Sequence, residues 1–348
     1  MRGTGDAVMH SRAERHGMKG SGARAGIHSP GNGDSRSESR ALMEKRLPDV
    51  EFRWDEPLAH HTTFRVGGRV SCLALPRTED ALAGLVREAR REGVPCVILG
   101  GGSNVLASDA AMDLLVVKVN SSCCGQIRSM DAGGGKWDVF AGAGVALPRL
   151  LGFCLRNGLE GLESLVGIPG TVGGALVMNA GTRDGCITDP LVRVEFLDRE
   201  GILQRIDRSE LPIGYRFTGL PEDCVVTGAH FLLTKADRGI LKGRWIDLMR
   251  QRKRAQPLGL PSAGCVFKNP VGLSAGALIQ RSGFKGFRVG DAQVSEKHAN
   301  WIVNRGAARA ADILALIQQI QQGVFRDFGV LLELEVKVLA HPSEGEIV

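Results

Sequence analysis

Residues 163–181 read ESLVGIPGTVGGALVMNAG. Five glycines and one proline stand among small and apolar residues, so the segment is too apolar for an ordinary surface loop. A regular helix is disfavoured, because glycine costs about 1 kcal/mol and proline about 3 kcal/mol at a helix position. Glycine is favoured where the backbone takes a positive φ or approaches a ligand closely. The stretch therefore predicts a wall of backbone packed against a flat ligand. A glycine-rich turn between core strands is the alternative.

Composition favours a ligand-binding protein of two domains. The chain has 348 residues, and glycine makes up 47 of them, about twice the usual share. The formal net charge is +6, but most of the excess lies before residue 47, so we expect no nucleic-acid partner. The eight cysteines lack CxxC spacing, which argues against a metal site or a disulfide framework and favours reduced thiols in the cytoplasm. No apolar run reaches roughly 18 residues, so we expect no membrane span.

The first 45 residues are rich in Gly, Ser, Arg and His and contain almost no large apolar residue. Such a segment cannot bury enough surface to offset its chain entropy, so we expect residues 1–45 to form a disordered tail. A basic tail that binds nucleic acid is the alternative. Ordered structure should begin near Glu51.

A second glycine segment follows a predicted strand. Thr78 can cap a helix whose apolar face contains Leu82, Leu85, Val86 and Ala89. Residues 94–99 then predict a short buried strand that leads directly into the glycines at 100–102. A strand followed by a glycine turn presents several backbone N–H groups in one concavity, which suits phosphate oxygens. The segment is neither a GxGxxG fingerprint nor a P-loop.

The other periodic segments predict further strands and helices. Strands are expected at 114–119, 139–143, 192–197, 202–206, 224–234 and 330–339, and helices at 147–155, 241–253 and 313–320. Residues 198–201 predict a hairpin turn between two of these strands. The basic run at 250–254 ends a predicted helix without interleaved aromatic residues. We therefore interpret it as a solvated helix end rather than a nucleic-acid patch.

Three polar residues interrupt apolar or glycine-rich runs. Arg216 lies between Tyr215 and Phe217, Cys265 follows a glycine, and Glu335 lies in the last predicted strand. Each has an ordinary interpretation. The arginine can form a surface cation–π pair, the cysteine can be a small buried hydrophobe, and the glutamate can be solvated. The sequence has no Ser-His-Asp, HExxH or paired-carboxylate pattern that competes with them.

Seven motifs in a fixed order closely resemble the UDP-N-acetylenolpyruvoylglucosamine reductases, the MurB family. They lie at 61–68, 101–104, 167–170, 178–181, 214–216, 264–270 and 334–337. The resemblance implies an α+β protein. Residues 46–238 would form a two-subdomain FAD-binding fold of the vanillyl-alcohol-oxidase (PCMH) type, and residues 239–342 an α+β substrate-binding domain.

The same resemblance implies an enzyme of peptidoglycan precursor synthesis. NADPH would reduce FAD, and the flavin N5 would transfer hydride to C3 of the enolpyruvyl ether of UDP-N-acetylglucosamine. Protonation at C2 would then give UDP-N-acetylmuramate. The partners would be these small molecules alone, and the protein would be a cytoplasmic monomer.

The resemblance also assigns roles to matching positions. Arg216 would bind the substrate carboxylate, Cys265 would donate the proton, and Glu335 would orient the reacting group. FAD would contact Arg65, Gly67, Gly100, Gly101, Gly102, Ser103, Asn104, Ile168, Pro169, Gly170, Gly173 and Asn179. The substrate would contact Tyr215, Lys268 and Asn269.

The chain departs from the family pattern in two ways. Most members have a serine where this chain has Cys265. A thiol, with an ordinary pKa of about 8.5, is a much stronger acid than a serine hydroxyl. The chain also resembles the MurB subgroup without a tyrosine-bearing insertion, so other groups must hold the diphosphate of the substrate.

Two other function classes remain open. One is a different flavoenzyme on the same fold, such as an oxidase of alcohols or sugars, which would not be expected to carry the motifs at 264–270 and 334–337. The other is a nucleotide-binding module without catalysis, which flavin absorbance would exclude.

Overall fold

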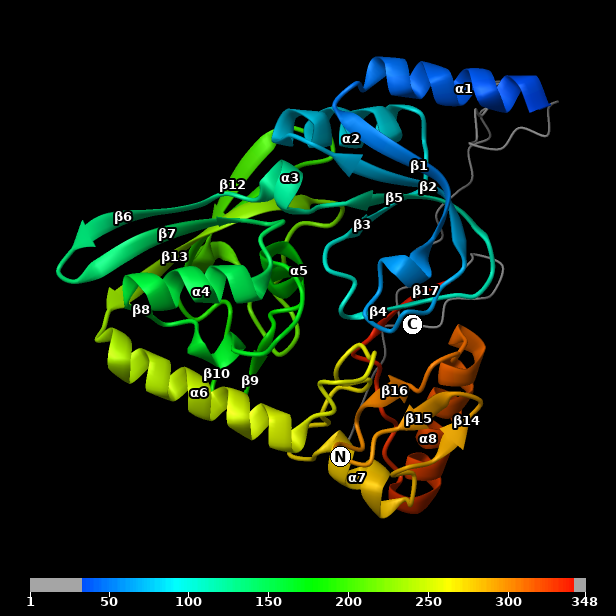
Figure 1. The fold of residues 1–348 in the computed structure, drawn as a ribbon, viewed down its shortest axis with the longest axis vertical. Coiled ribbons are helices and arrows are strands. Elements are labelled where there is room, and N and C mark those ends of the chain that lie inside the picture. Colours follow the sequence, from blue (N-terminus) through cyan, green and yellow to red (C-terminus); the bar gives the residue numbers. More distant parts are fainter. Residues whose placement is uncertain (1–32, 341–348) are drawn as a thin grey trace, which may run out of the picture.

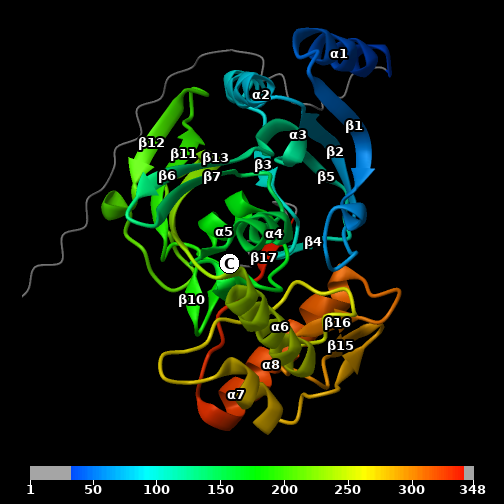
Figure 2. The same ribbon diagram turned by 60° about the vertical axis from the view of Figure 1, so that its left-hand side comes forward.

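The computed structural model describes residues 33–340, with side chains from residue 40 onward. Two β-sheets and their helices form the upper part of the molecule, and the C-terminal segment (orange to red) forms a lobe below them (Figure 1). Helix α6 (Arg238–Ala255) leads from the larger sheet toward this lobe (Figures 1 and 2). Asp237 caps α6, because its carboxylate accepts a hydrogen bond from the Ile240 backbone N–H.

The first sheet is mixed. Its strands lie in the order β1 (Val50–Pro57), β2 (Arg69–Pro76), β5 (Met112–Lys118) and β3 (Cys96–Leu99). The pair β1–β2 is antiparallel, whereas β2–β5 and β5–β3 are parallel. Helix α2 (Glu79–Arg91) buries the apolar face expected from the sequence, and the Thr78 hydroxyl caps it by accepting from Ala81 at 3.0 Å.

The second sheet is antiparallel. Its strands lie in the order β12 (Leu203–Asp207), β11 (Leu191–Leu197), β13 (Val225–Lys235), β7 (Lys136–Gly142) and β6 (Ile127–Gly133), and the short β8 (Leu159–Glu160) also pairs with β13. The predicted hairpin between β11 and β12 is confirmed. In its turn, the Asp198 carboxylate accepts from the backbone of Glu200 and Ile202.

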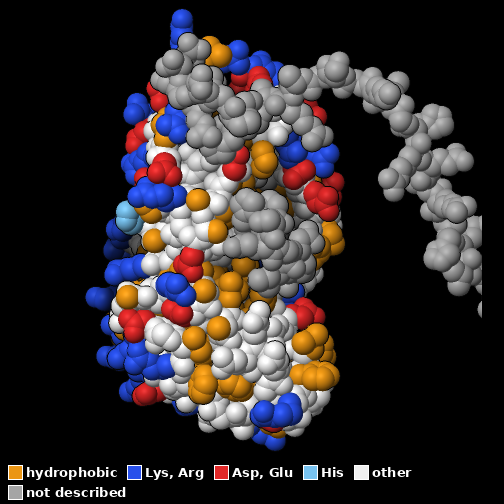
Figure 3. Space-filling view, turned by 90° about the vertical axis from the view of Figure 1, so that its right-hand side faces the viewer, with side chains coloured by type: hydrophobic (Ala, Val, Ile, Leu, Met, Phe, Trp, Pro, Cys, Tyr) orange, Lys and Arg blue, Asp and Glu red, His pale blue; other side chains and the backbone are white. Residues whose placement is uncertain are grey.

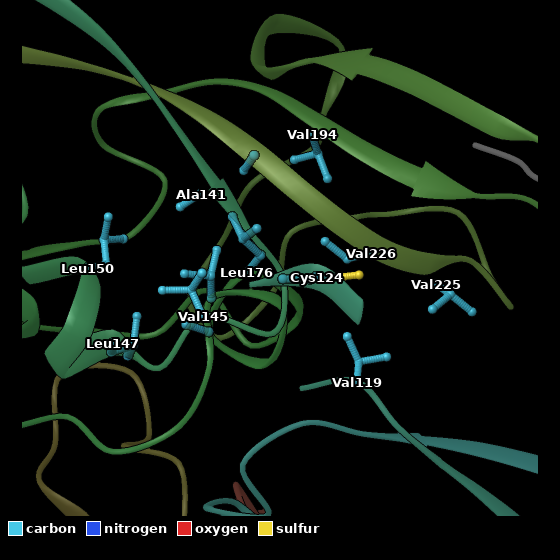
Figure 4. Close-up of a cluster of buried hydrophobic side chains, with 14 of the residues drawn as sticks. Val119, Cys124, Ala141, Val145, Leu147, Leu150, Leu176, Val194, Val225 and Val226 are labelled. Atoms are coloured by element: carbon cyan, nitrogen blue, oxygen red, sulfur yellow. The ribbon is translucent and has the colours of Figure 1, made fainter. Parts of the chain in front are cut away.

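One buried apolar cluster joins the two sheets. Leu85 of α2 and Val117 of β5 belong to the same cluster as Val194 of β11. Helices α4 (Leu147–Asn157) and α5 (Val172–Val177) contribute to it from the side of the second sheet. Figure 4 shows Val119, which follows β5, facing the side chains of β13. The predicted end of α4 is also confirmed, since Gly158 takes the left-handed conformation there.

The C-terminal lobe has its own core. It contains α7 (Ala275–Arg281), a small antiparallel sheet of β14 (Arg288–Val289), β15 (Ala292–Val294) and β16 (Ile302–Asn304), and α8 (Ala310–Phe328). Ile313, Ile317 and Ile320 of α8 are buried, as their spacing predicts. Phe64 and Val66 belong to the same core although they precede β2. The last strand, β17 (Lys337–Leu339), pairs in parallel with β4 (Val105–Ala107), so the chain end returns to the N-terminal part.

The prediction of disorder was wrong for part of the tail. Helix α1 (Gly33–Arg46) covers residues 33–45 of it, while residues 1–32 lie outside the described residues. Polar contacts attach the helix: the Glu44 carboxylate accepts from Trp54 Nε1 at 3.0 Å, and Arg46 pairs with Glu88 at 2.7 Å. Composition alone could not show this, because α1 is attached by charges and one aromatic residue rather than by an apolar face.

Three other expectations need correction. The strand predicted as buried is the edge strand β3, and its Cys96 and Ile98 are exposed. Of the strand expected at 330–339 only β17 is regular, although Leu332 and Val336 are buried as their alternation predicts. The central stretch contains the short helix α5, which Thr171 caps despite two glycines in the helix.

Surface charges are mixed on the face shown in Figure 3. Acidic and basic side chains lie next to one another on the upper part, and apolar or uncharged side chains cover most of the lobe below. Within residues 33–340, no helix is both long and apolar enough to cross a membrane.

Candidate active site

A cleft of about 1170 Å³ lies where the two sheets meet the C-terminal lobe. Most of its lining comes from residues within six segments: 98–105, 164–186, 214–216, 248–256, 263–265 and 298–301. The other lining residues are Val119, Ala143, Cys224, Val226, Asn269, Glu335 and Lys337. Ligand pockets usually enclose about 300–1000 Å³. The cleft is therefore large enough for a dinucleotide and a second ligand.

The two glycine segments predicted from the sequence pack against each other in this cleft. A Cβ atom on Gly101 would lie 2.8 Å from the Cα of Gly170, and one on Gly100 would lie 2.5 Å from Thr171 Oγ1. Gly170 has φ +115°, and the Ser103 hydroxyl donates to the Pro169 carbonyl at 3.2 Å. Side chains would fill this cradle, so only glycine leaves backbone N–H groups open to a phosphate. The cradle fits the pyrophosphate of FAD.

The wall that follows the cradle also depends on glycine. A Cβ on Gly173 would lie 2.9 Å from the Ala143 Cβ, so glycine lets α5 pack closely on the end of β7. Gly167 has φ +81°, and a Cβ there would lie 2.9 Å from Cδ of Arg252. The alternative of a plain turn between core strands is not supported, because Ile168 and its neighbours line the cleft.

Arg216 lies on a tight turn that Asn179 supports. Gly214 and Phe217 exchange both backbone hydrogen bonds across the turn, and Arg216 takes φ +57°. Asn179 is buried; its amide donates to the Gly214 carbonyl at 2.9 Å and accepts from the Thr188 hydroxyl at 2.9 Å. The central stretch thus fixes the position of the arginine.

Arg216 and Glu335 form a half-buried ion pair. Arg216 Nε donates to Glu335 Oε1 at 2.7 Å, and Nη1 donates to the Gly181 carbonyl at 3.3 Å. The Tyr215 ring lies 5.1 Å from the guanidinium carbon. Burial raises the pKa of the Glu335 carboxyl, and Arg216 opposes this increase. The remaining guanidinium N–H groups can bind a second carboxylate.

Cys265 lies beside this pair. The Glu335 backbone N–H donates to the Val266 carbonyl at 2.8 Å, which places the two segments side by side. Asn300 fixes Phe267, two residues after Cys265, because its side chain exchanges two hydrogen bonds with the Phe267 backbone. Burial raises the pKa of the Cys265 thiol to about 12, so the thiol is protonated at neutral pH.

The predicted substrate-binding residues divide into two groups. Tyr215 is exposed at the cleft, and its hydroxyl accepts a 3.3 Å hydrogen bond from the Asn269 backbone. Asn269 also lines the cleft. Lys268 is not among the lining residues and pairs with Glu333 at 3.2 Å.

Two predicted cofactor-binding residues lie away from the cleft. Arg65 is exposed with φ +56°, and it is not a lining residue. Gly67 has φ +134°, and a Cβ there would lie 2.8 Å from the Ala107 Cβ. The structure therefore gives Gly67 a packing role between the β1–β2 connection and β4.

Sequence reasoning missed several lining residues. Arg252 was interpreted as part of a solvated helix end, yet it is half-buried in the cleft and forms no ion pair within residues 33–340. Helical spacing could have found it, because Leu241, Leu248 and Arg252 lie on one face of α6. Four other lining residues had no sequence signal: Cys186, Gln256, His298 and Trp301.

Comparisons with known proteins agree with this architecture. Residues 70–207 match a family model described as an FAD binding domain. Residues 256–339 match the C-terminal domain of UDP-N-acetylenolpyruvoylglucosamine reductase.

Alignments with individual proteins cover more of the chain than these two family models do. The chain is 53% identical over 294 residues to the UDP-N-acetylenolpyruvoylglucosamine reductase of Syntrophobacter fumaroxidans, covering 84% of this chain and 85% of the relative. It is 42% identical over 299 residues to that of Myxococcus xanthus, covering 86% and 96%. The solved structure of MurB from Thermus caldophilus aligns with a TM-score of 0.70 at 39% identity, covering 83% of this chain and 98% of that one. The chain therefore belongs to the UDP-N-acetylenolpyruvoylglucosamine reductase (MurB) family, with its α+β, two-subdomain FAD-binding fold and C-terminal domain.

Proposed function

We propose that this protein uses NADPH to reduce UDP-N-acetylglucosamine enolpyruvate to UDP-N-acetylmuramate, as a cytoplasmic step of peptidoglycan precursor synthesis. One observation carries the proposal. The Arg216–Glu335 pair and the Cys265 thiol line the same cleft as the glycine cradle. This arrangement combines a carboxylate-binding cation, a proton donor and a phosphate site.

The cradle residues would hold the pyrophosphate of FAD, and residues 167–174 would lie against its ring system. Bound FAD would supply the redox chemistry, accepting hydride from NADPH and delivering it to the enolpyruvyl group. The protein would position the reactants and exclude water, because the wall consists of closely packed backbone and short apolar side chains rather than long mobile ones.

Arg216 would bind the substrate carboxylate. Its guanidinium is always charged, and its planar fork can keep Glu335 while it binds a second carboxylate. Negative charge that develops at C2 and on this carboxylate would then face a fixed cation in a half-buried site, where electrostatic stabilisation is stronger than in bulk water. Glu335 would keep the arginine oriented.

Cys265 would protonate C2. Burial keeps the thiol protonated at neutral pH, which is the required starting state for an acid. The backbone contact between Glu335 and Val266 keeps the thiol next to the carboxylate-binding pair. Proton donor and cation would therefore act on neighbouring atoms of one substrate.

The experiment is to measure NADPH oxidation by the purified protein with and without the enolpyruvyl substrate. We expect consumption to require that substrate, with UDP-N-acetylmuramate as the product by mass spectrometry. Peroxide formation with alcohols or sugars, without NADPH consumption, would instead identify an oxidase on the same fold. Absence of flavin from the folded protein would exclude both enzymes.

A further inference from the structure

Trp301 lies in the segment next to Cys265, because the Val266 backbone N–H donates to the Asn300 carbonyl at 2.9 Å. Trp301 is only 7% exposed and lines the same cleft as Cys265. Its Nε1 is buried, and no group within the described part of the chain accepts its proton. A buried donor without an acceptor is costly, so it calls for a functional explanation.

The backbone holds this indole in place. The backbone N–H of Trp301 donates to the His298 carbonyl at 3.0 Å, and the Trp301 carbonyl accepts from the Ser295 backbone N–H at 2.8 Å. The His298 and Trp301 rings lie 6.3 Å apart. The residue directly precedes β16, so its position is fixed by the small sheet of the lobe.

The charge state of Cys265 decides whether the indole has a partner. A neutral thiol is only a weak acceptor, so it leaves the buried indole N–H without a well-formed hydrogen bond. Burial and Glu335 raise the pKa of Cys265, whereas Arg216, the indole N–H of Trp301 and Arg252 lower it. The indole acts in this direction because a thiolate accepts a hydrogen bond more strongly than a thiol does. Trp301 thus favours only the deprotonated form.

We propose that Trp301 is a positioning residue whose indole N–H stabilises the thiolate that Cys265 becomes after it has protonated the substrate. The inference rests on the proposed function, in which Cys265 is the proton donor. In that step the S–H bond breaks and its electron pair stays on sulfur, while the electron pair of the enolate carbon forms the new C–H bond. Solvent water then returns a proton to the thiolate.

The first test needs no substrate. Iodoacetamide reacts with thiolates, so its rate at Cys265, followed by peptide mass spectrometry from pH 7 to about pH 10, reports thiolate stability. In Trp301→Phe we expect the pKa of Cys265 to rise by about one unit. Because a more basic thiolate is also more nucleophilic, alkylation at a fixed pH should slow only about threefold.

Controls separate this effect from simple opening of the cleft. Phenylalanine is smaller than tryptophan, so easier access would speed alkylation rather than slow it. Cys224 lines the same cleft and should react at an unchanged rate. Faster or unchanged alkylation of Cys265, or equal slowing of Cys224, would overturn the proposal. Because the test uses no substrate, this result would not depend on which compound the enzyme reduces.

The second test uses catalysis. Trp301→Phe should slow the substrate-dependent return of flavin absorbance about threefold or more in the wild-type background and leave it unchanged in Cys265→Ala. Equal slowing in both backgrounds would show a packing role and refute the inference. If Trp301→Phe does not fold, wild-type protein labelled with 5-fluorotryptophan replaces it. Its more acidic N–H should speed alkylation of Cys265, and no change would refute the proposal.

Discussion

Replacing Arg216 by lysine tests the carboxylate site. Lysine keeps the positive charge and has the same backbone strain at φ +57°. Charge and backbone strain therefore differ little between wild type and Arg216→Lys. One ammonium group cannot reproduce the 2.7 Å contact to Glu335, the 3.3 Å contact to the Gly181 carbonyl and a bidentate contact to a ligand. The variant therefore changes geometry more than charge.

The size of the effect follows from these contacts. A hydrogen bond that involves a charged group contributes about 1.5–3 kcal/mol. Loss of one such contact in the transition state would lower kcat by roughly 10- to 150-fold. Flavin content should not change, because the cradle at 100–104 and 169–171 is separate from the arginine turn.

Steady-state turnover with the enolpyruvyl substrate measures the loss, and flavin absorbance reports the fold. Arg205→Lys is a matched control, since Arg205 Nε also contacts a glutamate Oε1 at 2.7 Å but its side chain is 60% exposed, against 19% for Arg216. The control should retain wild-type activity. Turnover of Arg216→Lys within about twofold of wild type would refute the proposed role of Arg216.

Three further predictions follow from single residues. Gly167→Ala would place alanine at a positive φ, and the new Cβ would displace the Arg252 side chain. Gly272→Ala is the matched control, because Gly272 has a similar φ of +71° and a Cβ there would meet no atom within 4 Å. Both should lose about 1–2 kcal/mol of unfolding free energy in urea, but only Gly167→Ala should lose activity. Asn179→Ala removes the support of the arginine turn and should cost about 2 kcal/mol and lower kcat more than tenfold; wild-type values would contradict that support. Cys265→Ser tests the thiol pKa. Between the ordinary pKa of about 8.5 and the folded pKa of about 12, the thiol ionises in the unfolded chain but not in the folded protein. Wild type should therefore lose about 1.4 kcal/mol of unfolding free energy per pH unit relative to the serine variant, and parallel stability curves above about pH 9 would contradict the burial of the thiol.

The local sequence rules predicted the elements whose stabilising contacts lie nearby in the chain. Thr78 caps α2 within one turn, and Gly158 ends α4, so both boundaries follow from short-range chemistry. The sequence offered one indication that the two glycine segments lie together in the cleft, namely that both are rich in glycine. Their fit depends on contacts such as Gly101 against Gly170, which join distant parts of the chain.

The expectations that failed concern long-range partners. Helix α1 depends on Trp54 and Glu88, and residues 330–336 depend on contacts with the segment after Cys265 rather than on a strand ladder. The basic run at 250–254 predicts a solvated helix end, but Arg252 shares one face of α6 with Leu241 and Leu248 and lines the cleft. The roles of the site residues and the domain limits remain predictions.

Stopped-flow absorbance of Cys265→Ala, recorded separately for the two half-reactions, tests the proposed proton transfer from Cys265. NADPH should bleach the flavin of this variant at close to the wild-type rate, because the thiol takes no part in that step. Return of flavin absorbance on adding the enolpyruvyl substrate should slow by roughly 10²- to 10⁴-fold, as expected for a lost general acid, and Cys265→Ser should recover much of the loss. Return at the wild-type rate in the alanine variant would show that Cys265 is only a packed residue and would leave Glu335 as the proton donor.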